Sequence, residues 1–110
     1  MEQKTTKALR QKQKVLLHRL PPLQAILRGS LIERYKRCGK PGCKCAEGRG
    51  HGPKYYLSIS HPGRRPEMDY IPAEFQQKVK AYLENYRKVK EILEEFSAIS
   101  RELLRRRERF

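Results

Sequence analysis

The chain has 110 residues, a length that suggests one domain. Hydrophobic residues make up only 37% of it and tryptophan is absent, so the core should be small enough to need a bound metal or a second copy of the chain. The net charge of +14 favours a polyanionic partner, nucleic acid first and an anionic membrane second. The alternative is that the charge only keeps the protein soluble.

The first residues, MEQKTTKALRQKQK, lack the apolar stretch of a secretory signal. No run approaches the roughly 20 apolar residues that span a bilayer. We therefore expect a cytoplasmic protein without a membrane partner, in which thiols stay reduced.

An α+β fold in three segments is predicted. Residues 1–29 form a basic segment with a helix over 2–20, which Pro21 and Pro22 end. One or two further helical turns are expected in residues 23–28.

Residues 30–71 form a cysteine-containing, three-stranded antiparallel meander. The strands are SLIERYKRC, KYYLSIS and PEMDYI, and HPGRR (61–65) is the turn before the third. In the second strand, alternation puts Tyr55 and Leu57 on one face and Tyr56 and Ser58 on the other. We expect Tyr55 and Tyr70 to pack within the sheet and Tyr56 to be the more exposed aromatic residue.

Residues 72–110 contain no glycine, and no proline after Pro72, and predict one long, coiled-coil-like amphipathic helix. At 1.5 Å per residue it would be about 57 Å long, against a radius of gyration of about 13 Å for a compact domain of this size. Its apolar stripe should therefore pack on the N-terminal helix, on a second chain through residues 75–104, or on both. The predicted stripe comprises Phe75, Val79, Tyr82, Tyr86, Val89, Leu93, Phe96 and Leu103, with Ser100 at one position.

All three cysteines lie in one glycine-rich turn, as Cys38-x4-Cys43-x-Cys45-x5-His51. Zinc prefers four ligands drawn from thiolate and imidazole, and this turn supplies four. His61 is an alternative fourth ligand. The spacing is not a standard one, so two other interpretations stay open, a turn without metal and a redox or nucleophilic role. If zinc is bound, its binding free energy contributes to folding.

Cations with interleaved tyrosines suit a phosphate backbone, a groove or unpaired bases. We expect a non-catalytic DNA- or RNA-binding surface in the meander. The predicted contact residues are Arg34, Lys36, Arg37, Lys40, Lys44, Lys54, Tyr56, Arg64 and Arg65.

Two other functions remain open. The long helix could bind a partner protein as an accessory module, with the charge assisting. A small metal-dependent nuclease would need a cluster of carboxylates, for which Glu67 and Asp69, with Glu33 and Glu47 elsewhere in the meander, are the candidates.

The stretches GSLIERYKRCGKPGCKC, HGPKYYLS, YIP and ENYRKVKEILEEFSAISRELL carry a resemblance. Over residues 30–104 the chain resembles a family of small uncharacterised prokaryotic proteins often encoded among mobile elements. The resemblance implies that the three cysteines and His51 act as one unit, and it makes a nucleic-acid context plausible by association. It implies no activity.

Overall fold

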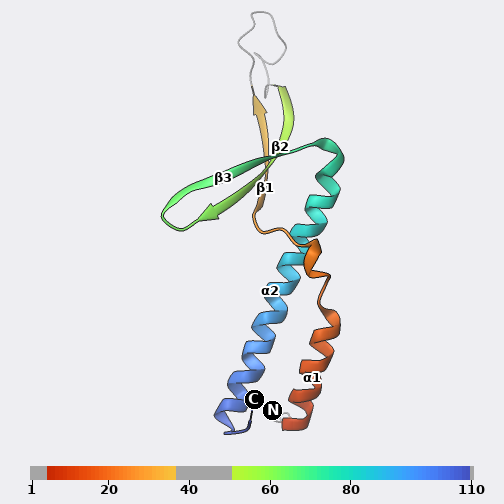
Figure 1. Cartoon of the computed structure of the whole chain (residues 1–110), viewed down its shortest axis with the longest axis vertical. Helices are drawn as coiled ribbons and strands as arrows, with labels where there is room; N and C mark the ends of the chain where they lie inside the picture. The colour runs from red at the N-terminus through yellow and green to blue at the C-terminus, as the bar shows by residue number, and fades with distance from the viewer. Residues whose placement is uncertain (1–4, 37–50, 110) are drawn as a thin grey trace, which may run out of the picture. The chain divides into compact units, whose positions relative to one another are not determined.

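The computed structural model describes residues 5–36 and 51–109, apart from the side chains of Lys36, His51 and Gly52. It has the predicted α+β architecture (Figure 1). In chain order the elements are α1 (Thr6–Arg19), a 3₁₀ turn (Leu23–Ala25), β1 (Ser30–Lys36), β2 (His51–His61), β3 (Arg64–Ile71), a 3₁₀ turn (Ala73–Phe75) and α2 (Gln76–Arg105).

The first helix is shorter than the predicted 2–20. It begins at Thr6 because the Thr5 hydroxyl accepts a hydrogen bond from the Ala8 amide at 3.0 Å, which caps the first turn. It ends at Arg19, ahead of the two prolines, since proline fixes φ and removes a backbone donor. The described part of α1 carries no acidic residue, so this helix is uniformly basic.

The second helix starts four residues later than predicted, because Pro72 leads into a 3₁₀ turn before regular helix begins. At its end Arg107 has a φ of 59°. The Glu108 amide donates to the Leu103 carbonyl at 2.9 Å and the Arg107 amide to the Leu104 carbonyl at 3.0 Å. This is a Schellman motif, which ends the helix by satisfying its last carbonyls. No helix of the described residues is long and apolar enough to cross a membrane.

The chain divides into two compact units. The helical unit comprises Met1–Ile26 and Glu84–Phe110, and the sheet unit comprises Leu27–Leu83. In the helical unit, α1 and the later part of α2 enclose an apolar core. The Asn85 side chain of α2 also donates a hydrogen bond to the Ala25 carbonyl at 2.9 Å. The core is formed by Leu9, Leu16, Ile92, Ile99 and Leu103, with Leu20 and Phe96 packed against it.

The apolar stripe of α2 was predicted partly wrongly. Leu93 is 57% exposed and Ile92 is buried in its place, while Ile99 is buried where Ser100 was expected. The stripe that the core uses runs through Val89, Ile92, Phe96, Ile99 and Leu103, with the alternating spacings of three and four typical of a heptad. Adjacent apolar residues at 92 and 93 satisfy the sequence pattern equally well, and the packing of α1 decides between them.

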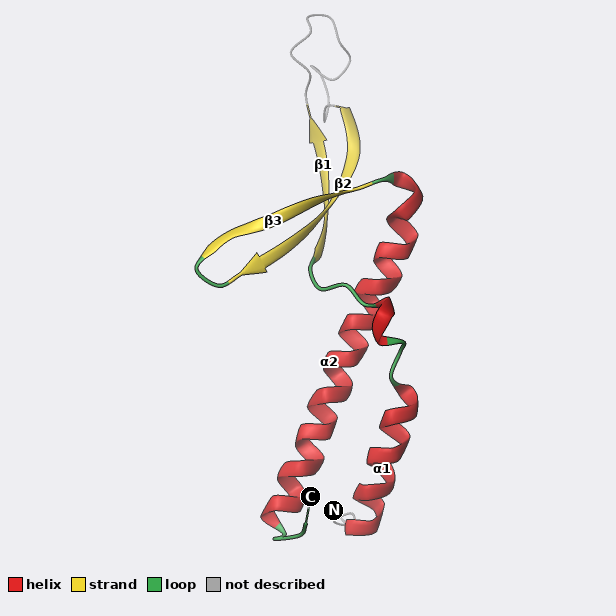
Figure 2. Ribbon diagram, viewed as in Figure 1, coloured by secondary structure: helices red, strands yellow, loops and turns green. Residues whose placement is uncertain are grey.

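The sheet has the order β1-β2-β3 with both pairs antiparallel, as predicted (Figure 2). The long central strand β2 pairs with β1 from His51 to Ser58 and with β3 from Tyr55 to His61. All three strands therefore lie side by side only near the middle of β2. Pro62 and Gly63 form the predicted turn between β2 and β3.

Gly29 is required where the chain enters β1. Its φ is 143°, and a Cβ there would lie 2.7 Å from the Ser58 carbonyl oxygen and 2.9 Å from the Leu57 Cδ1. Any larger residue would strain the backbone and push on a buried leucine. The glycine thus lets the entry to β1 lie close against β2.

Candidate functional site

The strand register separates charge between the two faces of the sheet. Residues directly opposite each other on antiparallel strands share a face, and alternate residues along a strand do too. One face therefore carries the buried Leu57 and Ile71 together with Glu33, Glu67 and Asp69. The other face, called here the basic-aromatic face, consists of Ser30, Ile32, Arg34, Lys54, Tyr56, Ser58, Met68 and Tyr70. It has cations and no carboxylate.

Two cations lie on neighbouring strands of the basic-aromatic face. Arg34 of β1 is the register partner of Lys54 of β2, and like charges placed directly opposite in a sheet repel. No carboxylate of the described residues lies within 4.0 Å of either cation. An anion bound beside both side chains would offset their positive charges.

The cations of α2 contrast with this pair. Arg87 forms ion pairs with both Glu84 and Glu91 along the helix, and its hydrogen bond holds the pKa of Glu84 below the usual value. The pKa of Glu102 is lowered in the same way, mainly by the hydrogen bond from Arg106. Two cations of α2, Arg87 and Arg105, are therefore paired with carboxylates of the same helix.

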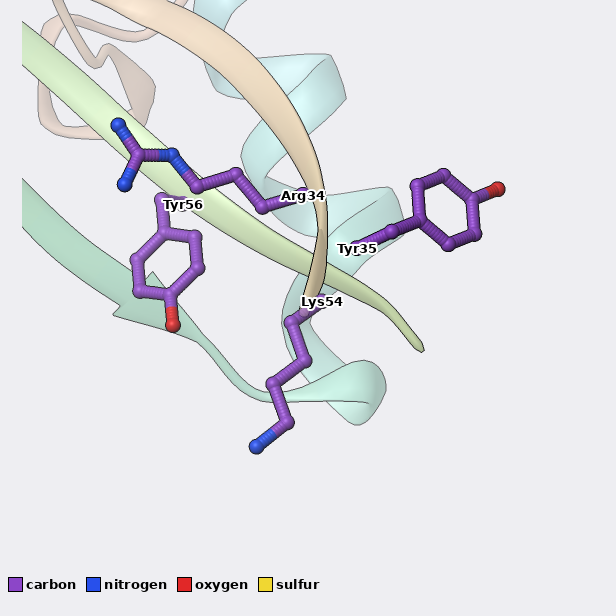
Figure 3. Close-up of a pocket in the computed structure, with 4 residues that line it drawn as sticks. All are labelled: Arg34, Tyr35, Lys54 and Tyr56. Atoms are coloured by element: carbon purple, nitrogen blue, oxygen red, sulfur yellow. The ribbon is translucent and has the colours of Figure 1, made fainter. Parts of the chain in front are cut away.

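Two tyrosines adjoin the cation pair. Tyr56 and Tyr70 are register partners, and their ring centroids lie 5.7 Å apart at 66°, an edge-to-face contact. The Arg34 guanidinium lies over the Tyr56 ring, 5.9 Å from its centroid. Figure 3 shows Arg34 and Tyr56 on the same side of the sheet, with Tyr35 pointing away from them. The Tyr35 hydroxyl instead donates to Glu33 at 2.6 Å.

A hollow of about 250 Å³ lies beside this part of the sheet, lined by Arg34, Tyr35, Lys54 and Tyr56 (Figure 3). Pockets for complete small ligands span roughly 300–1,000 Å³. The hollow suits a single group, such as a phosphate, belonging to a molecule that extends over the surface.

The expected exposure of the tyrosines was wrong in one respect. Tyr70 is 57% exposed, whereas Tyr56 is half-buried. Tyr56 lies on the central strand with neighbours on both sides, and Tyr70 lies on an edge strand with one neighbouring strand. Tyr70 was not among the predicted contact residues. The signal that could have found it was its alternation with Glu67 and Asp69, which puts it on the face opposite the carboxylates.

Other predicted contact residues lie apart from this face. Arg64 and Arg65 at the β2–β3 turn are exposed, and Arg64 Nη2 lies 3.7 Å from Glu67 Oε1. The structure therefore brings together Arg34, Lys54 and Tyr56 from the predicted set, and keeps the turn arginines as a separate basic feature. The remaining predicted contacts, Arg37, Lys40, Lys44 and the side chain of Lys36, lie outside the described residues.

The predicted zinc ligands Cys38, Cys43 and Cys45, and the side chain of His51, also lie outside the described residues. The alternative ligand His61 has its Nε2 buried, 3.4 Å from Glu67 Oε1. In the part of the chain that the structure describes, no three His, Cys, Asp or Glu residues are grouped so as to hold a metal ion. The zinc site stays a prediction from sequence.

The carboxylates considered for a nuclease are spread over the sheet. Glu33 lies on β1, and Glu67 and Asp69 lie on β3, with the central strand between them. Glu33 accepts the Tyr35 hydroxyl, and Glu67 faces His61 and Arg64. Glu47 lies outside the described residues.

The family model that describes a domain of unknown function, DUF6788, matches residues 6–81. The chain belongs to this family. The DUF6788 match covers α1, the whole sheet and the first turns of α2, so the basic-aromatic face lies entirely within it. Comparisons with curated proteins and with solved structures found no match.

Proposed function

We propose that this DUF6788 protein binds nucleic acid, without catalysis, through the basic-aromatic face of its sheet. The observation that carries the proposal is the Arg34–Lys54 pair, two opposed cations with no carboxylate of the described residues in reach. A bound phosphate accepts hydrogen bonds from both side chains and removes their mutual repulsion.

The segregation of charge supports the proposal. Randomly solvated charges would mix over both faces, but the acidic residues of the three paired strands lie opposite the basic-aromatic face. The chain as a whole carries a charge of +14, which attracts a polyanion over a distance and speeds its encounter. The face thus combines a local site for an anion with a long-range positive field that attracts polyanions.

Titration of the full chain against labelled oligonucleotides tests the proposal. We expect binding at about 50 mM salt to single strands or duplexes of about 20 nucleotides, measured by fluorescence anisotropy. Logarithmic affinity should fall linearly with logarithmic salt, by about 0.7 per neutralised phosphate on single strands and about 0.9 on duplexes.

The outcomes separate the three functions. Absence of binding to DNA and RNA of either form at low salt would reject the proposal in favour of a partner-protein module. Degradation of the oligonucleotide after addition of Mg²⁺ or Mn²⁺ would reject its non-catalytic part and support a nuclease.

A second candidate function, protein binding through the helices, has its own observation. Several large apolar side chains of the helices are exposed, including Leu17 at 59%, Leu93 at 57% and Leu104 at 49%. A second copy of the chain or another helical protein could cover them, as the heptad pattern also suggests. Measurement of the molecular mass in solution distinguishes a dimer from a monomer.

The cysteine turn is proposed to hold one zinc ion that supports the sheet unit. The proposal rests on four candidate ligands within fourteen residues of sequence, Cys38, Cys43, Cys45 and His51. We expect about one zinc per chain by elemental mass spectrometry, a lower content in Cys43→Ser, and a lower melting temperature after chelation. A metal-free protein whose melting temperature is unchanged by chelator would contradict it.

A further inference from the structure

We infer that the basic-aromatic face recognises unpaired nucleotides, with the ring of Tyr70 as the stacking platform. The inference rests on the proposed function and specifies its substrate, a single strand of DNA or RNA. It depends on the exposure of one aromatic ring and on the position of that ring relative to the Arg34–Lys54 pair.

Tyr70 is presented to solvent by its neighbours. Its ring is in edge-to-face contact with Tyr56 at 5.7 Å, and the residue remains 57% exposed. Tyr56 itself is half-buried and has the Arg34 guanidinium over its ring. The Tyr56 ring therefore acts as a support that fixes Tyr70, and Tyr70 offers the accessible aromatic surface.

The cations lie where the phosphates of a stacked strand would pass. Tyr56 is opposite Tyr70 in the register, and Lys54 is two residues from Tyr56 on the same face, about 7 Å along β2. Arg34 faces Lys54 from β1. A base stacked on Tyr70 thus leaves its sugar-phosphate chain within reach of two long cationic side chains, and charge complementarity assigns the occupant as a polyanion.

Stacking selects single strands over duplexes. In a duplex each base already has neighbours on both faces, and only base edges are accessible in the grooves. A tyrosine ring gains a stacking partner when the base is unpaired, and such contacts tolerate any sequence because every base has a π-face. A strand that crosses the sheet at Tyr70 is therefore expected to bind without strong sequence preference.

The decisive experiment compares oligomers with and without bases. The full chain is titrated at one low salt concentration with oligothymidylate, oligouridylate, an abasic deoxyribose-phosphate oligomer of equal length, and a duplex. The inference predicts that both base-containing single strands bind at least about fivefold more tightly than the abasic oligomer. Any difference between oligothymidylate and oligouridylate tells which sugar the face prefers.

Single substitutions test whether the preference for base-containing oligomers depends on Tyr70. Tyr70→Ala should reduce the preference for oligothymidylate over the abasic oligomer about fivefold or more and leave abasic binding unchanged, because the phosphate contacts remain. Tyr70→Phe should keep the preference, since the ring is retained. Phe75→Ala, at an aromatic residue that is 49% exposed and lies outside this face, is the matched control and should also keep it. Circular dichroism checks that each variant is folded.

Each remaining outcome overturns either the inference or the proposed function. Equal affinity for base-containing and abasic oligomers in the unaltered chain would overturn the inference and leave the nucleic-acid proposal standing. Tighter binding to the duplex, or an unchanged preference in folded Tyr70→Ala, would also overturn it. Absence of binding to every oligomer would overturn the proposed function itself.

Discussion

Replacement of Leu103 by alanine is expected to lower the free energy of unfolding of the helical unit by about 2–5 kcal/mol. Leu103 is fully buried and shares the core with Leu16, which is also fully buried, and with Leu9 of the same helix α1. Alanine would remove three buried carbon atoms and leave a cavity that two packed helices cannot easily close. Urea unfolding followed by circular dichroism at 222 nm measures the loss.

The neighbouring leucine provides the matched control. Leu104 is 49% exposed, so Leu104→Ala makes the same chemical change one position away and should cost less than about 1 kcal/mol. Equal losses in the two variants, or a greater loss at Leu104, would show that α2 buries a different face. The pair therefore tests which face of α2 is buried near its C-terminal end.

The sequence predicted the order of the elements because their signals are local. Pro21 and Pro22 end a helix whatever surrounds it, and Pro62 with Gly63 favours a turn between two alternating strands. The absence of glycine after residue 72 likewise favours an uninterrupted helix. These features act within a few residues and need no knowledge of tertiary contacts.

The sequence could not predict which individual residues of α2 are buried. Ile92 and Leu93 are adjacent and similarly apolar, so either can continue the stripe from Val89. Ile92 is the buried one because it belongs to the core to which α1 contributes Leu9 and Leu16. A rotation of α2 by one residue about its axis would have satisfied the sequence pattern with Leu93 buried.

Part of the candidate site was predictable and part was not. Arg34 and Lys54 were chosen as basic residues that flank the predicted strands, and Tyr56 was chosen from the alternation of the second strand. Their meeting on one face depends on a register that pairs Arg34 with Lys54 and Tyr56 with Tyr70. Tyr70 was expected to pack within the sheet, and its position on an edge strand exposes it instead.

Removal of both opposed cations is expected to have the largest effect on binding. Arg34→Ala with Lys54→Ala takes away two side chains that are not balanced by a carboxylate among the described residues. Because the two side chains are proposed to hold one phosphate together, the affinity for a single strand at about 50 mM salt should fall on the order of tenfold. The loss should be similar for all sequences, because phosphate contacts carry no base information.

A second double variant separates a specific contact from a general charge effect. Lys80→Ala with Lys88→Ala removes the same charge from two exposed positions of α2. Long-range attraction alone would make the two double variants equal, since both reduce the net charge by the same amount. A contact at the basic-aromatic face makes the first loss much the larger.

The salt dependence of single-strand binding in these two double variants tests the central claim most directly. Logarithmic affinity is plotted against logarithmic salt concentration for the unaltered chain and for both variants. Loss of Arg34 and Lys54 should make the slope shallower by about 0.7, for the one phosphate that the two side chains are proposed to share, and loss of Lys80 and Lys88 should leave it nearly unchanged. Identical slopes in all three proteins, with similar affinities, would contradict the claim that the basic-aromatic face holds the nucleic-acid backbone.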